Sequence, residues 1–220
     1  MTHTIRLFAA FAALSLCTAT LHAQTDGTCV PISERGGRKL GCFITARHDI
    51  GRLLVSPPLY WHLERYESRA EAQHRAERDT RSIAVESFDE YWVFTIAPFE
   101  WRSPAGKSFA RVGPLPLVDA AKFAAVYMEA TFEPGMHSMV HRHDGAEAWV
   151  TLEGSQCLET PNGKLEQRAG DPGVVVPGGL PMMLTGTGTG VRRSLVLILQ
   201  DATKPRSTPA TDWTPKGLCL

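Results

Sequence analysis

The sequence between residues 124 and 199 falls into short segments rich in apolar and β-branched residues, with turn residues between them. Pro161-Asn162-Gly163 is a strong hairpin signal, and residues 186–190 provide another flexible reversal. Many short strands at this spacing indicate a closed or double-sheet all-β domain. The strands that we expect are residues 124–132, 148–152, 156–160, 164–168, 173–176, 182–185 and 193–199.

The stretch of residues 135–154, GMHSMVHRHDGAEAWVTLEG, contains two histidines and a glutamate at a spacing that suits one metal ion. His141 and His143 are two residues apart, so on a strand both side chains point to the same face. Residues 144–146 read as a tight turn, after which Glu147 can return toward the histidine pair. Two imidazoles and one carboxylate on one side of an ion leave the opposite positions open for water, dioxygen or substrate.

The order and spacing of Gly135, His141, His143, Glu147 and Gly154 resemble the first motif of the cupin family. Members of this family fold as small jelly-roll barrels and usually hold a divalent metal on these side chains. The resemblance covers about residues 119–202. It implies a mainly β chain with a cupin-like jelly-roll β-barrel and a transition metal, which the ligand types narrow to iron, copper, zinc, nickel or manganese.

Residues 170–184, GDPGVVVPGGLPMML, carry the glycine and proline frame of the family's second motif. Met182 stands where that motif normally has a histidine, so the usual four-ligand set is incomplete. Three outcomes are open: a three-ligand site, a Met182 thioether ligand that favours a soft ion such as copper(I), or a cavity for apolar ligands.

His137, Trp149 and Met182 are the other side chains that we associate with this site. His137 is our candidate catalytic residue, because a histidine transfers protons near neutral pH. Alternatively, His137 replaces the missing metal ligand or lies at the rim of the pocket. Trp149 and Met182 are expected to line a substrate pocket, and a plain core role is the alternative for both.

Residues 24–118 are patterned as folded protein and are expected to form an α+β extension that packs on the barrel. Ser68 and Glu71 form a capping box for a charged helix ending near Arg78. The helix and the lack of glycine-framed hairpins favour an added layer, which extends the barrel sheet and roofs its mouth, over a degenerate second barrel. The turn at residues 112–116 marks the boundary. Further strands are expected at residues 60–66, 81–86 and 91–96.

Residues 1–23 are interpreted as a signal peptide, in which Arg6 precedes an apolar run over residues 7–16. This run is shorter than the roughly 20 apolar residues of a membrane span. A lipid anchor at Cys17 is the alternative, but Leu16 is bulkier than the small residue expected before such a cysteine. We therefore expect a periplasmic or secreted protein that acquires its metal outside the cytoplasm. There the general order of affinities for divalent metals favours copper and zinc over iron and manganese.

Four cysteines follow the signal peptide, an even number for an oxidising compartment, and they allow three pairings. The glycine-rich segment between Cys29 and Cys42 is flexible enough to close, which favours a bridge between these two. A bridge between Cys157 and Cys219 would then connect the tail, residues 203–220, to the barrel. This tail is rich in proline and threonine, so it is expected to be extended.

The chain carries 23 basic and 23 acidic residues without a basic stripe, so its charge gives no indication of a nucleic-acid partner. Our first hypothesis is an exported, metal-binding oxidoreductase of dioxygenase type that acts on a small organic molecule. The alternative is a non-catalytic cupin that binds a metal or metabolite, which the missing histidine favours, and a structural role is a third hypothesis. The resemblance also implies a homodimer as a possible assembly.

Overall fold

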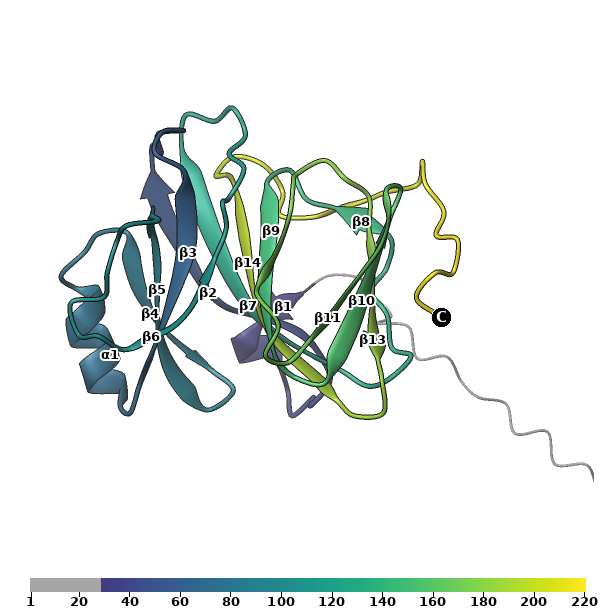
Figure 1. Cartoon of the computed structure of the whole chain (residues 1–220), viewed down its shortest axis with the longest axis horizontal. Coiled ribbons are helices and arrows are strands. Elements are labelled where there is room, and N and C mark those ends of the chain that lie inside the picture. The colour runs from purple at the N-terminus through teal and green to yellow at the C-terminus, as the bar shows by residue number, and fades with distance from the viewer. Residues whose placement is uncertain (1–28) are drawn as a thin grey trace, which may run out of the picture.

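The computed structural model describes residues 29–220, and the fold is mainly β, which confirms the expected fold class. The expected signal peptide, residues 1–23, and the alternative lipid anchor at Cys17 lie outside the described residues. Figure 1 shows a β-barrel and, beside it, a smaller layer of strands with one helix. No helix within residues 29–220 has the length and apolar composition needed to cross a membrane.

Two sheets form the barrel. The larger sheet has six strands, in the order β1 (Val30–Pro31), β2 (Gly41–Gly51), β7 (Phe123–Phe132), β14 (Arg192–Asp201), β9 (Ala146–Glu153) and β12 (Val174–Val176). The smaller sheet has three, in the order β11 (Gly163–Arg168), β10 (Ser155–Thr160) and β13 (Met183–Thr187). All neighbouring strands in these sheets are antiparallel except β1 and β2. This is the jelly-roll arrangement that the sequence predicts.

The central strands of the larger sheet, β7, β14 and β9, are buried on both faces, so they have two apolar sides. On β9, Trp149 packs inside the barrel, whereas Ala148 and Val150 pack on the outer face. On β14, Val196 and Ile198 likewise point inward. Every residue of β7, the strand between β2 and β14, is buried for the same reason.

A four-stranded antiparallel sheet forms the N-terminal layer, in the order β4 (Ser82–Ser87), β5 (Glu90–Pro98), β3 (Leu59–Tyr66) and β6 (Ser108–Val112). Its Trp61 and Phe94 pack against Tyr127 of β7, with ring centroids 6.1 and 4.9 Å from that of the tyrosine. The layer therefore covers the outer face of the larger sheet (Figure 1). The expectation that it roofs the barrel mouth is wrong, because its large apolar side chains need an equally apolar surface, which β7, β9 and β14 provide.

The helix α1 (Arg69–Ala76) lies on the other face of this layer. It begins where the capping box predicts, with the Glu71 N–H donating to Ser68 Oγ at 3.3 Å. It ends two residues before the expected end near Arg78. Beneath it, Arg75 Nε lies 3.1 Å from Glu64 Oε2 in a buried ion pair, and Arg69 forms an exposed ion pair with Glu86 of β4. Paired charges as well as apolar contacts therefore hold the helix to the sheet.

The strand β2 connects the N-terminal region to the barrel, and the sequence did not predict it. A single 3-10 turn, η1 (Ile32–Glu34), lies between β1 and β2. β2 pairs with β7 from Gly41 to Gly51, so part of the expected extension is a barrel strand. Near its end β2 carries the charged side chains of Arg47 and Asp49, which are exposed.

Both expected disulfides are formed, Cys29 with Cys42 and Cys157 with Cys219. The second bridge holds the tail on the barrel, where β15 (Thr208–Pro209) pairs with β8 (His141–Arg142). The tail is therefore extended, but it is fixed by backbone pairing beside the residues of the metal motif.

Candidate metal centre

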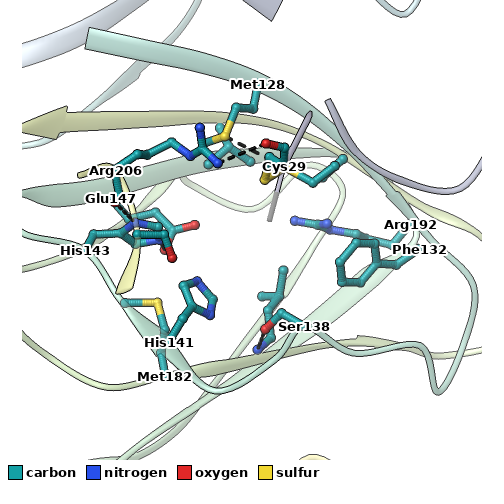
Figure 2. Close-up of a pocket in the computed structure, with 15 residues that line it drawn as sticks. Cys29, Met128, Phe132, Ser138, His141, His143, Glu147, Met182, Arg192 and Arg206 are labelled. Atoms are coloured by element: carbon teal, nitrogen blue, oxygen red, sulfur yellow. Dashed lines mark hydrogen bonds and ion pairs between the residues drawn. A yellow bond between two sulfur atoms is a disulfide. The ribbon is translucent and has the colours of Figure 1, made fainter. Parts of the chain in front are cut away.

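The three proposed metal ligands lie together inside the barrel. His141 belongs to β8, His143 follows that strand, and Glu147 is the second residue of β9. Their ligand atoms all lie within 4.8 Å of one another, and His143 Nε2 is 3.4 Å from Glu147 Oε2. Figure 2 shows the three side chains grouped on one side of a cavity. These three residues have a suitable spacing in the sequence, and the structure brings their side chains together.

Backbone carbonyls orient both imidazoles. His141 Nδ1 donates to the Met139 carbonyl at 2.8 Å, and His143 Nδ1 donates to the Arg206 carbonyl at 2.6 Å. A donating Nδ1 leaves the Nε2 lone pair of each ring free for a metal ion. Because Arg206 belongs to the C-terminal tail, the tail takes part in orienting a ligand.

Two glycines allow the loop between the ligands to pack tightly. A Cβ atom on Gly145 would lie 1.9 Å from a carbonyl oxygen of β14, and one on Gly178 would lie 2.2 Å from the Asp144 carbonyl oxygen. The Gly179 N–H donates to the His143 carbonyl at 2.7 Å. The glycine frame of the second motif therefore supports the loop that carries the ligands.

The protonation states of this group suit a metal ion. Burial alone would raise the pKa of Glu147, but the adjoining His143 and the charges of His141 and Arg192 outweigh it, so this pKa lies below its ordinary value. Burial, together with the neighbouring His143, lowers the pKa of His141. An ionised carboxylate and a neutral imidazole are the forms that bind metals, so the donor set fits a divalent transition metal.

Met182 occupies the position beside His141. Its N–H donates to the His141 carbonyl at 2.8 Å, and its carbonyl accepts from the His141 N–H at 3.1 Å. Its side chain is buried and lines the cavity. A thioether thus lies near the imidazoles at the site where the resemblance implies a further histidine, and whether it coordinates a metal stays a prediction.

The cavity beside the ligands is small and largely apolar. Its volume is about 60 Å³, about twice the roughly 30 Å³ that one water molecule occupies in the liquid. The disulfide between Cys29 and Cys42 forms part of its wall, together with apolar side chains that include Met128, Phe132 and Val196.

Two arginines of the cavity wall, Arg192 and Arg206, escaped sequence reasoning. Arg192 is only 1% exposed, and its guanidinium carbon lies 5.2 Å from the centroid of the Phe132 ring. Burial lowers the pKa of Arg192 to about 9 against the opposing charge of Glu147, so the guanidinium is protonated at neutral pH. Strand periodicity could have found it, since Arg192 shares the inward face with Val196, but the expected strand began one residue later.

The structure places His137 and Trp149 outside the wall of this cavity. His137 forms a β-bridge with Thr185, and its Nδ1 donates to the Ser138 carbonyl at 3.1 Å. Trp149 is buried in the barrel core, on the same strand face as Glu147. Proton transfer by His137 and a pocket role for Trp149 therefore stay predictions.

No family model matches this sequence, and no curated protein matches it. Solved structures do resemble it, among them an uncharacterized conserved protein with a double-stranded beta-helix domain from Klebsiella pneumoniae, at 16% identity and a TM-score of 0.35, over 45% of this chain and 78% of that one. A cupin-like protein from Thermotoga maritima matches at 16% identity and a TM-score of 0.35, over 39% of this chain and 64% of that one.

A structure of the DMSP lyases RdDddP and RnDddQII matches at 19% identity and a TM-score of 0.35, over 40% of this chain and 44% of that one. At such identities the likeness concerns the fold alone. The barrel's own strand order and pairing carry the assignment of a cupin-like fold, and the resemblance stated from the motif is confirmed at that level.

Proposed function

We propose that this protein is an exported, cupin-type protein that binds a divalent transition metal through His141, His143 and Glu147. A small organic molecule would occupy the open side of the metal. The observation that carries this proposal is the convergence of three ligand atoms within 4.8 Å, with the Nδ1 atom of each imidazole already engaged by a carbonyl. The ligand types suit iron, copper, zinc, nickel or manganese.

We place the protein in the periplasm or outside the cell. Two disulfides within residues 29–220 are compatible with an oxidising compartment, and the sequence of residues 1–23 supports export. In that compartment the general affinity order favours copper and zinc over iron and manganese.

Within this site we favour an oxidoreductase of dioxygenase type. The metal, when bound, supplies Lewis-acid or redox chemistry. The chain itself orients the ligands through the Met139 and Arg206 carbonyls and excludes water with the apolar cavity wall. His137 is the residue that we propose to move a proton, from its place next to the cavity-lining Ser138. The second candidate is a non-catalytic binding protein, which Met182 in place of a histidine favours.

Oxygen uptake with phenols and diketones distinguishes the two candidates. We expect protein loaded with iron or copper to consume oxygen with a member of this panel, and Glu147→Ala to lose that activity together with the metal. Stoichiometric metal without oxygen uptake would support the binding protein. A wild-type protein that retains no metal would contradict the oxidoreductase and a metal-binding role, and it would leave only the binding of a metabolite.

The homodimer implied by the resemblance is also a proposal. The outer face of the six-stranded sheet packs against the N-terminal layer, so a pair of subunits would have to use a different surface. Light scattering coupled to gel filtration measures the mass directly, and a monomeric mass would contradict the dimer.

A further inference from the structure

Arg192 carries a buried charge that forms no ion pair with any residue of the described part of the chain, residues 29–220. It is the first residue of β14 and lies inside the barrel, where its Nε and Nη1 atoms have no hydrogen-bond partner among residues 29–220. Figure 2 shows the guanidinium pointing into the cavity, across from Glu147 and His143. The neighbouring Arg193 shows the contrast, because its side chain is on the outer face and its Nη1 lies 3.2 Å from Glu153 Oε1.

The charges around the cavity favour an anion. Glu147 is the carboxylate that faces Arg192. When Glu147 binds a metal ion, the positive ion neutralises the charge of this carboxylate, so the carboxylate no longer balances Arg192. The second arginine of the wall, Arg206, is half-buried, and its Nη2 donates to the Cys29 carbonyl at 2.9 Å. A divalent ion, one carboxylate and two guanidinium groups sum to a positive site in a poorly solvated space, where an unpaired buried charge is unfavourable.

We propose that Arg192 is the anion-binding group of this site and that its ligand is a short organic carboxylate. The ligand carboxylate accepts hydrogen bonds from the guanidinium, which is a strong, charge-assisted pairing. A hydroxyl or carbonyl oxygen on the adjacent carbon then faces the metal held by His141, His143 and Glu147. This inference rests on the proposed metal site, and it narrows the substrate from a small organic molecule to a small organic acid.

The cavity limits the size of this acid. A volume of about 60 Å³ restricts the ligand to a short acid and excludes a bulky one. The remaining wall includes Met128, Leu184 and Val196, so it suits a hydrocarbon portion and disfavours a second charged group. Phe132, under the guanidinium, holds Arg192 in its orientation.

The test uses the protein loaded with cobalt(II), whose visible spectrum reports on its ligands, and two probes of similar size. Glycolate carries a carboxylate and an adjacent hydroxyl, whereas ethylene glycol carries no charge. We expect glycolate to change the cobalt spectrum of the wild type and ethylene glycol to have no effect at the same concentrations. Arg192→Met is expected to bind cobalt at the wild-type stoichiometry but glycolate about 10- to 100-fold more weakly.

Arg193→Met is the matched control, because it removes the same charge from the next residue of the strand on the opposite face, and its glycolate affinity is expected to equal that of the wild type. If Arg192→Met does not fold, Arg192→Lys is used instead. Its glycolate affinity is expected to lie between that of the wild type and the roughly 10- to 100-fold weaker binding expected of Arg192→Met. Unchanged glycolate affinity in the Arg192 variants, or equal binding of ethylene glycol, would overturn the proposal. Absence of cobalt from the wild type would instead contradict the metal site itself. Measuring the cobalt content of each protein therefore distinguishes failure of the metal site from failure of the anion site.

Discussion

At the scale of single residues, Met182 determines whether the site has three ligands or four. Met182→Leu keeps the volume of this buried side chain and removes its sulfur, and such swaps usually cost less than about 1.5 kcal/mol. We expect the variant to retain the wild-type amount of metal, because two imidazoles and a carboxylate hold it. Elemental analysis of the purified variant measures this, and loss of copper from a folded Met182→Leu protein would show that the thioether is a ligand.

His62 gives the N-terminal layer a dependence on pH. Burial lowers the pKa of His62, although the Pro98 and Ala97 carbonyls that its Nε2 contacts oppose this effect. As the pH falls, the unfolded chain, whose histidines have a pKa near 6.5, therefore takes up its proton before the folded chain. The free energy of unfolding is expected to decrease below about pH 6.5 and to level off once the folded pKa is passed.

One proton accounts for at most about 1.4 kcal/mol per pH unit of this decrease. His62→Gln keeps a side-chain N–H and cannot titrate, so its free energy of unfolding is expected to decrease less than that of the wild type between pH 7 and pH 5.5. His74→Gln, at an exposed position, is the control and should behave as the wild type does. Urea unfolding at both pH values checks the prediction, which fails if the His62 and His74 variants respond alike.

The residues of the site differ in how far sequence could predict them. His141, His143 and Glu147 lie within seven positions of one another, so local strand and turn geometry brings them together. Arg192 is 45 positions beyond Glu147, and it reaches the cavity because β14 begins at this residue, where it pairs with Phe132 of β7, and runs between β7 and β9. A local sequence pattern does not predict which distant strands pair, so it could not place Arg192 at the site.

At the scale of elements, the turn of the second motif is expected to support the ligand loop. Gly178→Ala would place a Cβ atom 2.2 Å from the Asp144 carbonyl oxygen, and overpacking of this kind typically costs about 1–3 kcal/mol. We expect lower thermal stability and weaker metal binding in this variant. Gly190→Ala is the control, because its Cβ atom would meet no atom within 4 Å. Metal titration checks both, and wild-type affinity in Gly178→Ala would contradict the supporting role.

Strand prediction succeeded where turns frame a segment and failed at β2. The hairpin between β10 and β11 follows from Pro161-Asn162-Gly163, and both strands lie within one residue of their expected positions. β2 mixes Phe43 and Ile44 with polar residues such as Arg47. Its burial falls from Gly41 toward Gly51, and two register shifts against β7 interrupt the alternation of its side chains, so a regular apolar pattern is absent from its sequence.

At the scale of the whole molecule, the N-terminal layer and the barrel share one core, and we expect them to unfold together. Trp61 of β3 is fully buried between Phe94 of its own layer and Tyr127 of the barrel. Trp61→Ala is expected to lower the free energy of unfolding by about 3–5 kcal/mol without separating the transition into two. Leu54→Ala, at a site 66% exposed, is the control. Circular dichroism during urea unfolding checks this, and a separate early transition of the layer would contradict a shared core.

The position of that layer was beyond sequence reasoning for a physical reason. The aromatic residues of β3 and β5 predict a buried face, but several surfaces of a barrel can bury it. The layer packs on the surface formed by β7, β9 and β14, because these strands are apolar on both faces. That they form one continuous apolar surface is known only once their pairing is known.

Elemental analysis of protein purified after export, for the wild type and for His141→Ala/Glu147→Ala, tests the metal site itself. The metal site predicts close to one equivalent of a transition metal in the wild type and almost none in the double variant. His74→Ala, which changes an exposed histidine of α1, serves as the control and should keep the metal. Equal metal content in the wild type and the double variant would contradict the account.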